Sequence, residues 1–118
     1  MLIFMSNFKY KQQEIKTKGI KVSLFDGSKE IARAFVFLIK NDLHEKPYGL
    51  LEDVFVLEEY RGKGLGKKIV KHAIEAAKAE GCYKLIATAR FSKDWLVPFY
   101  EGLGFKKWGV EFRMDFDK

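Results

Sequence analysis

The sequence has little of the chemistry that holds small proteins together through cross-links or metals. Of its 118 residues, one is a cysteine and two are histidines, so neither an internal disulfide framework nor a metal site is expected. Cys82 suits a small apolar position in the interior, and His44 and His72 suit the surface. The two prolines and the lack of any repeat or low-complexity tract give no sign of a linker.

Long apolar runs are also missing. No run approaches the roughly 20 residues that a membrane-spanning helix needs. The first residues, MLIFMSNFKYKQ, lack the basic start and the small-residue cleavage site of a signal peptide. We therefore expect no membrane association and, with the single cysteine, a reducing, cytoplasmic setting.

What remains is the composition of a globular protein. Apolar residues make up 47% of the chain and charged residues 32%, which predicts one compact domain over residues 1–118. The formal net charge of +6 favours an anionic partner such as a phosphorylated cofactor, although a plain soluble surface explains it as well. We do not expect nucleic acid as the partner, because basic and aromatic residues do not interleave along one strand face.

The hydrophobic pattern predicts a mixed α+β domain of the order β-β-β-α-β-α-β(-β). The expected elements are strands at 19–26, 31–39 and 50–57, a helix from the glycine-rich loop to Gly81, a strand at 83–88, a short helix at 94–102 and a closing pair of strands at 105–116. Asp26 and Gly27 predict a hairpin turn, residues 41–49 predict a loop, and Gly81 predicts the end of the long helix.

Three glycines and four cations meet in EEYRGKGLGKK, residues 58–68. The first turn of a helix has unpaired N–H groups and about half a positive charge, so glycines at that point let a phosphate approach the backbone. Two known phosphate loops do not fit. A nucleotide P-loop requires glycine where Arg61 stands and a hydroxyl where Lys68 stands, and a dinucleotide fingerprint requires glycine in place of Lys67.

The segment does match R-x-x-G-x-G, at Arg61, Gly64 and Gly66, and FYEGLGF follows at 99–105. Together these motifs resemble the GCN5-related N-acetyltransferase (GNAT) family over roughly residues 50–105, and the order LEDVFVLEEYRGKGLG looks like spermidine/spermine acetyltransferases. The resemblance implies a single GNAT-type domain, with a central mixed, mostly antiparallel sheet flanked by helices. It also implies direct transfer of an acetyl group from acetyl-coenzyme A (acetyl-CoA) to a primary amine: a small amine or polyamine, an amino acid, or a protein lysine or N-terminus.

The resemblance further implies where acetyl-CoA binds. A strand would pair with its pantetheine arm and loop amides would hold its pyrophosphate, through Val54, Phe55, Val56, Arg61, Gly62, Lys63, Gly64, Leu65, Gly66 and Lys67. Lys63, Lys67, Lys68 and Lys71 would screen the phosphates, or else form a solvated helix face. Many relatives carry asparagine where this chain has Lys93, so the pantetheine contact would pass to that residue or to the backbone of 93–96.

Acetyl transfer requires a neutral amine, and neutralising an amine with a pKa of about 10.4 at pH 7 requires about 4–5 kcal/mol. A carboxylate within reach eases this step. Glu52 is the predicted base, because burial on its strand would raise its pKa; the alternative is an exposed carboxylate at a strand end. Asp53 would point to the opposite face of a regular strand.

The departing thiolate needs a proton, and Tyr100 is the predicted acid. The resemblance places the tyrosine of FYEGLGF near the thiol, and a phenol with a pKa of about 10 is protonated at pH 7. The alternative is a core aromatic residue with a hydrogen-bonded hydroxyl. By the same resemblance, the amide around Phe55 would face the thioester carbonyl.

The front of the chain is short for the family. Residues 1–18 show no clear helical period, so the acceptor site would be either open or completed by a second subunit in a homodimer. Arg90 and Trp95 would shape the acceptor side. Core or dimer-interface packing is expected of Phe105, Trp108, Phe112 and Phe116. The alternative function is a non-catalytic module that binds or senses acyl-CoA.

Overall fold

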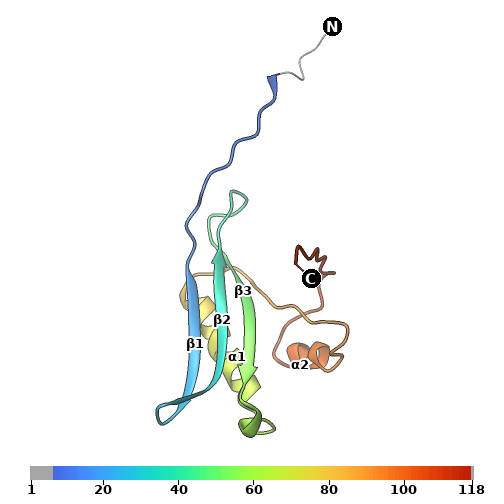
Figure 1. Ribbon diagram of the computed structural model, residues 1–118. Coiled ribbons are helices and arrows are strands. Elements are labelled where there is room, and N and C mark those ends of the chain that lie inside the picture. The colour runs from blue at the N-terminus through green and yellow to red at the C-terminus, as the bar shows by residue number, and fades with distance from the viewer. Residues whose placement is uncertain (1–6, 118) are drawn as a thin grey trace.

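A computed structural model of the chain describes residues 7–117 (Figure 1). The elements are β1 (Gly19–Asp26), β2 (Lys29–Ile39), β3 (Tyr48–Val56), the 3-10 helix η2 (Glu58–Tyr60), α1 (Leu65–Ala79), β4 (Leu85–Ile86) and α2 (Leu96–Gly102). Residues 8–18 belong to no helix or strand, and they lead away from the sheet in Figure 1.

The four strands form one sheet in the order β1-β2-β3-β4. The first three are antiparallel neighbours, and β4 runs parallel to β3 because α1 returns the chain to the same end of the sheet. The β1–β2 hairpin turns at Gly27, whose φ of 61° is left-handed. The mixed α+β class and the order β-β-β-α-β-α are therefore confirmed.

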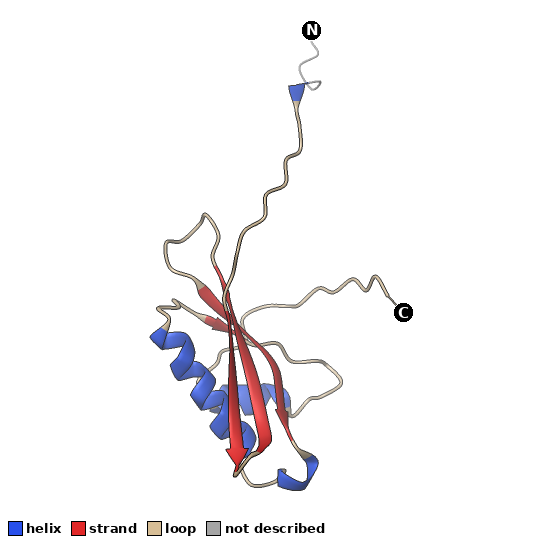
Figure 2. Ribbon diagram, turned by 60° about the vertical axis from the view of Figure 1, so that its left-hand side comes forward, coloured by secondary structure: helices blue, strands red, loops and turns tan. Residues whose placement is uncertain are grey.

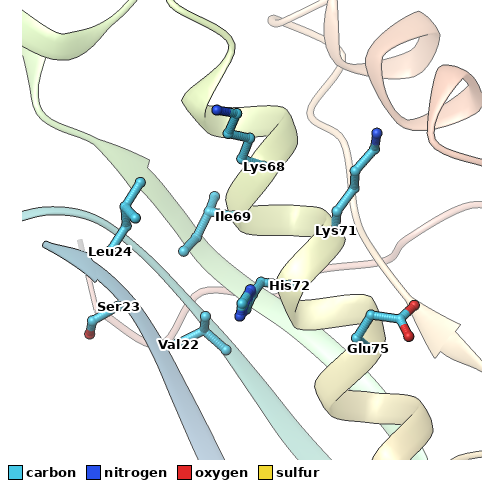
Figure 3. Close-up of a pocket in the computed structure, with 8 residues that line it drawn as sticks. All are labelled: Val22, Ser23, Leu24, Lys68, Ile69, Lys71, His72 and Glu75. Atoms are coloured by element: carbon cyan, nitrogen blue, oxygen red, sulfur yellow. The ribbon is translucent and has the colours of Figure 1, made fainter.

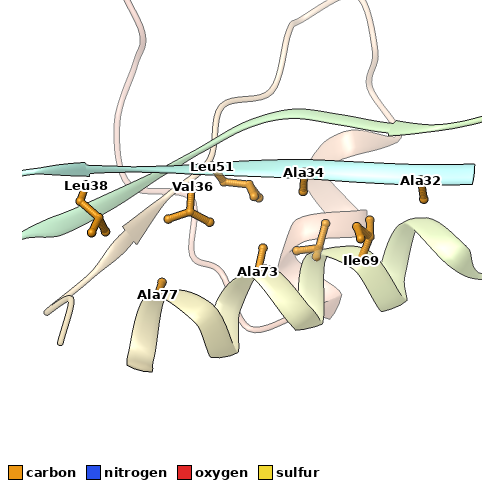
Figure 4. Close-up of a cluster of buried hydrophobic side chains, with 9 residues drawn as sticks. Ala32, Ala34, Val36, Leu38, Leu51, Ile69, Ala73 and Ala77 are labelled. Atoms are coloured by element: carbon orange, nitrogen blue, oxygen red, sulfur yellow. The ribbon is translucent and has the colours of Figure 1, made fainter. Parts of the chain in front are cut away.

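The core lies between the sheet and α1 (Figure 4). Alternate residues of β2 point toward the helix, which offers the apolar stripe that its period of 3.6 residues predicts. The buried cluster comprises Ala32, Ala34, Val36, Leu38, Leu51, Ile69, Val70, Ala73 and Ala77. The helix ends as expected, since Gly81 follows it with a φ of 79°. Residues of α2 pack against the same cluster, and no helix of the described chain lies over the opposite face (Figure 2).

The short helix α2 begins at Leu96, two residues later than predicted. Its N-cap is Trp95 in place of Asp94, and no side chain caps it. Pro98 falls in the first turn, where a missing N–H leaves no helical hydrogen bond unmade. The proline is therefore accommodated and does not break the helix.

The predicted strands after α1 are shorter or missing. The strand expected at 83–88 is reduced to Leu85–Ile86, and residues 105–116 form no strand. The closing pair was a wrong prediction, because a strand needs a hydrogen-bonding neighbour and within the described chain these residues have none. Trp108, Phe112 and Phe116 are exposed and do not belong to the core, whereas Phe105 packs against it. Within residues 7–117, no helix is long and apolar enough to cross a membrane.

Candidate active site

A β-bulge interrupts β3 directly after the predicted base. The register between β2 and β3 shifts between Arg33 and Phe35, so that Ala34 lies opposite two residues, Asp53 and Val54. Asp53 has a φ of 50° and is the one described residue other than glycine with a positive φ. Aspartate is among the few residue types that visit this left-handed region.

Two backbone hydrogen bonds show what the bulge does to β3. Before it, the Gly49 N–H donates toward β4, to the Lys84 carbonyl at 2.9 Å. Beyond it, the Leu57 N–H donates toward β2, to the Ile31 carbonyl at 2.9 Å. Both donors are odd-numbered, yet they point to opposite neighbours, because the bulge inserts one residue into the alternation.

The alternation after the bulge leaves an unpaired strand edge. The Leu57 N–H points toward β2, and N–H directions alternate along a strand. Counting back from Leu57, the Phe55 N–H therefore also points toward β2, and the N–H groups of Val54 and Val56 point toward the β4 side. Within residues 7–117, however, β4 pairs with β3 only at Gly49 and Leu50. The last residues of β3 therefore offer free backbone groups to which an extended ligand can add like a strand.

An arginine holds the bulge. The Arg33 guanidinium donates to both carboxylate oxygens of Asp53, from Nε at 2.9 Å and from Nη2 at 3.2 Å, and these hydrogen bonds lower the pKa of Asp53. The same guanidinium lies 4.7 Å from the Phe55 ring centre, and that of Arg61 lies 5.4 Å from it. Arg61 also donates to the Val56 carbonyl at 2.8 Å. The end of β3 is thus fixed by two cations around one aromatic ring.

The predicted phosphate loop lies where β3 leads into α1. Gly62 and Gly64 have left-handed φ values of 80° and 78°, a conformation in which a side chain is strained. Gly64 is also the N-cap of α1, and no side chain caps the helix. Gly66 differs from both: it is helical, and a Cβ there would lie 3.9 Å from Phe99 Cζ, an ordinary contact. Nothing in the described part of the chain requires glycine at position 66. Its missing side chain leaves the N-terminus of α1 accessible from outside.

The lysines around the loop divide into two groups. Within residues 7–117, none of Lys63, Lys67, Lys68 and Lys71 takes part in a salt bridge. Lys63 stacks on Tyr60 at 5.4 Å from the ring centre. Lys68 and Lys71, by contrast, line a groove of about 450 Å³ between α1 and β1 (Figure 3), together with His72 and apolar residues of β1. That groove contains none of the predicted catalytic residues.

The two predicted catalytic residues lie on different elements, Glu52 on β3 and Tyr100 on α2. Tyr100 is half-buried on α2, with ring centres 5.2 Å from Phe99 and 5.3 Å from Phe105. Burial raises the pKa of Tyr100, and the charge of Glu52 raises it further. The phenol therefore stays protonated at neutral pH, as an acid must. Glu52 itself is exposed, so its expected burial was wrong: on the side of the sheet away from α1, no element of the described chain covers it.

One other expectation about this region also changes. Asp53 does not take the opposite face from Glu52, because the bulge removes the regular alternation and Asp53 is bound to Arg33. Lys93 is exposed in the loop before α2, where its N–H donates to the Arg90 carbonyl at 3.0 Å. In the described residues, no group of three or more acidic, histidine or cysteine side chains could hold a metal ion.

Sequence reasoning missed Arg33. The only signal for it is a charge in the otherwise apolar run IARAFVFLI of β2, and a single charge on a half-buried strand is ordinary. Its partner lies 20 residues away, and the bulge that brings them together has no signature in a single sequence.

The model of the acetyltransferase (GNAT) family matches residues 7–105. The chain belongs to the GNAT family. Two curated relatives are the glucosamine 6-phosphate N-acetyltransferase of Trypanosoma brucei brucei, 42% identical over 67 residues, and the thialysine N-epsilon-acetyltransferase of Bos taurus, 42% identical over 55 residues. These matches cover 57% and 46% of this chain, and 44% and 32% of the relatives.

A solved GNAT structure shows the same architecture. The glucosamine-6-phosphate N-acetyltransferase of Arabidopsis thaliana superposes with a TM-score of 0.74 and 29% identity, over 84% of this chain and 67% of that one. The matches to the two curated relatives are shorter, and the chain spans less than half the length of each of them. Neither of those relatives is named for a polyamine, so the narrower resemblance to spermidine/spermine acetyltransferases stays a prediction.

Proposed function

We propose that the chain is an acetyl-CoA-dependent N-acetyltransferase that acetylates a small primary amine. One observation supports the proposal above all: the free strand edge at Val54 and Val56 is followed in the chain by α1, whose N-terminus after Gly64 has no side-chain cap. A long ligand with an amide-containing arm and a pyrophosphate fits both features at once. The net charge of +6 favours such an anion, and we infer that nucleic acid is not the partner.

The proposed reaction needs no covalent enzyme intermediate. The neutral amine attacks the thioester carbonyl, its proton passes to the Glu52 carboxylate directly or through one water, and the carbon–sulfur bond breaks. Tyr100 gives its proton to the departing thiolate, which leaves as the free thiol. For the carbonyl oxygen, strand alternation favours the N–H of Val54 or Val56 over that of Phe55, which faces β2.

The acceptor amine would bind near Glu52, which the described chain leaves uncovered. The exposed Glu52 suits an amine that arrives from solvent or in a cleft that a second subunit completes. Relatives named for glucosamine 6-phosphate and thialysine make these two amines the first to test, with spermidine as the third. We also infer that the enzyme acts in the cytoplasm, as its single cysteine suggests, and that it is a homodimer.

Binding and turnover are tested separately. Thermal unfolding is measured with acetyl-CoA and, as the control, with ATP at the same concentration. A ligand at a hundred times its dissociation constant adds about 2.7 kcal/mol, which raises the unfolding midpoint by several degrees. A shift with acetyl-CoA alone supports the site, and thiol release on addition of an amine supports the reaction. Binding without release for any amine favours the sensing module, and no shift removes the proposal.

The acid role of Tyr100 is tested by Tyr100→Phe. Only the hydroxyl is lost, so the packing on Phe99 and Phe105 stays and acetyl-CoA should bind with an unchanged dissociation constant. The turnover number should fall about 100-fold or more, as is typical for loss of a general acid. Unchanged turnover contradicts the assignment, and an equal loss of binding shows that the residue acts through packing.

A further inference from the structure

The tip of the β1–β2 hairpin is bound to the segment that leads into the glycine turn, residues 62–66. η2 connects the end of β3 to that turn, and it lies at the same end of the sheet as the hairpin turn (Figure 1). The last pair of the hairpin is Asp26 opposite Lys29. The Tyr60 hydroxyl donates to Asp26 Oδ2 at 2.6 Å. Beside it, Lys29 Nζ donates to Glu59 Oε2 at 3.1 Å, so two neighbouring residues of η2 are tied to the pair that closes the hairpin.

The ring of Tyr60 makes a second set of contacts. Lys29 Nζ lies 5.6 Å from its centre and Lys63 Nζ lies 5.4 Å from it, distances at which an ammonium group is attracted to the face of an aromatic ring. Lys63 belongs to the glycine turn, between the left-handed Gly62 and Gly64. Tyr60 therefore contacts the hairpin through its hydroxyl and the turn through its ring.

The backbone alone holds this segment weakly. η2 has three residues, none of them buried, and no side chain caps it. Its backbone donors, the N–H groups of Tyr60 and Arg61, reach carbonyls three residues earlier at 2.9 and 3.1 Å, which is the poorer geometry of a 3-10 turn. The glycines that follow have the most conformational freedom to lose. A ligand that binds such a turn must order it, unless other contacts of the protein already do so.

We propose that Tyr60 is a positioning residue for the phosphate-binding turn. Its hydrogen bond to Asp26 fixes η2 against the hairpin, and its ring keeps the Lys63 ammonium at the turn, where it is available to a phosphate of the ligand. Acetyl-CoA as that ligand rests on the proposed function, whereas the contacts themselves do not depend on it. The hydrogen bond to Asp26 also raises the pKa of Tyr60, so the hydroxyl remains a donor at neutral pH.

Two ligands separate a positioning role from a general effect on stability. Acetyl-CoA carries the pyrophosphate and the nucleotide, whereas acetyl-pantetheine has the same arm without them. A residue that only stabilises the fold would change the affinity for both ligands alike. A residue that orders the turn would change the affinity for acetyl-CoA alone.

Two substitutions at Tyr60 divide its two contacts. Tyr60→Phe removes the hydroxyl and keeps the ring, and Tyr60→Leu removes both. In calorimetric titration, acetyl-CoA should bind about 3- to 10-fold more weakly to Tyr60→Phe and more than about tenfold more weakly to Tyr60→Leu. KM for acetyl-CoA should rise with kcat unchanged, and the affinity for acetyl-pantetheine should stay the same. Tyr10→Leu is the matched control, because Tyr10 is fully exposed in the segment before β1, and it should alter neither affinity.

A double-mutant cycle tests the hairpin as the support. In the Asp26→Ala background, Tyr60→Phe should have no further effect on the affinity for acetyl-CoA, whatever the alanine does to the hairpin itself. Lys29→Met should also weaken binding, because it removes both the contact with Glu59 and that with the Tyr60 ring. Lys18→Met breaks a similar exposed salt bridge, in which Lys18 Nζ lies 2.9 Å from a carboxylate oxygen, and should leave binding unchanged.

Amide hydrogen exchange of the ligand-free chain gives a readout that needs no ligand. In Tyr60→Leu, residues 58–66 should exchange about tenfold faster or more than in the wild type, while α1 beyond Ile69 should not change. Wild-type exchange in this segment overturns the positioning role, and so does an equal loss of affinity for both ligands. Independent effects of Tyr60→Phe and Asp26→Ala overturn the hairpin as the support. Faster exchange in a chain whose wild type binds no acetyl-CoA overturns the proposed function and the ligand assigned here, but not the contact between hairpin and turn.

Discussion

At the scale of single residues, Gly66 gives the clearest separation between folding and ligand binding. Gly62 and Gly64 are required by their left-handed φ values, so their replacement would disturb the loop whether or not a ligand binds. Gly66 is helical, and the space around it accepts a methyl group. A glycine in a helix that the fold does not need indicates that something approaches the backbone from outside.

Gly66→Ala should therefore stabilise the protein and weaken the complex. Alanine in a helix is favoured over glycine by about 0.5–1 kcal/mol, so the unfolding midpoint should rise by a few degrees. Calorimetric titration should show at least a tenfold weaker affinity for acetyl-CoA. Gly102→Ala is the matched control, because it lies in α2 and its Cβ would meet nothing within 4 Å. An unchanged affinity in Gly66→Ala would remove the pyrophosphate from this turn.

At the scale of secondary-structure elements, the bulge makes β3 a binding edge. It reverses which backbone groups face β2, and the Arg33–Asp53 pair holds it. The pair lowers the pKa of Asp53, so its contribution to stability is present above the unfolded pKa of about 3.9 and is lost as the pH falls through the folded value. Both side chains are partly exposed, which keeps this contribution small.

Two substitutions at Asp53 separate its backbone from its carboxylate. Asp53→Ala removes the carboxylate and puts alanine at a φ of 50°, whereas Asp53→Gly removes the carboxylate without backbone strain. The alanine variant should unfold with about 1 kcal/mol less free energy than the glycine variant, measured by denaturant titration. Equal stabilities would mean that the left-handed bulge does not form.

The same pair can be broken from its other side. Because Arg33 and Asp53 hold the bulge together, Arg33→Gln should weaken acetyl-CoA binding to the same extent as Asp53→Gly.

Sequence and structure agree best where the signal is local. The Asp26-Gly27 turn, the apolar stripe of α1 and the end of that helix at Gly81 all follow from a few adjacent residues, and all three are confirmed. The bulge was missed because it depends on Arg33, which is 20 residues away from Asp53. The exposure of Glu52 was missed because it depends on which face of the sheet remains uncovered.

At the scale of the whole molecule, the chain is more extended than a compact domain of its length. Its radius of gyration is 18.7 Å, whereas about 13–14 Å is typical for this number of residues. Extended segments at both ends account for the difference (Figure 2). The core of the described chain is small, since Val36 and Val70 are its largest fully buried side chains.

The net charge of +6 makes ligand binding depend on salt. The affinity for acetyl-CoA should fall several-fold between about 50 mM and 500 mM sodium chloride, because the Debye length shrinks from about 14 Å to about 4 Å over this range. Acetyl-pantetheine, which lacks the nucleotide and its charges, should show almost no salt dependence. The same slope for both ligands would show that the lysines near α1 do not act on the phosphates.

The sequence by itself determined the class of the fold, the glycine-rich turn before α1 and the family to which the chain belongs, because each rests on short-range spacing. It also carried the alternation of residues 107–117, but not their structure. Only the tertiary structure decided that, among the described residues, the end of β3 has a free edge and residues 107–117 have no strand neighbour. A strand is defined by its hydrogen-bonding partner, and that partner lies far along the chain, where local spacing carries no signal for it.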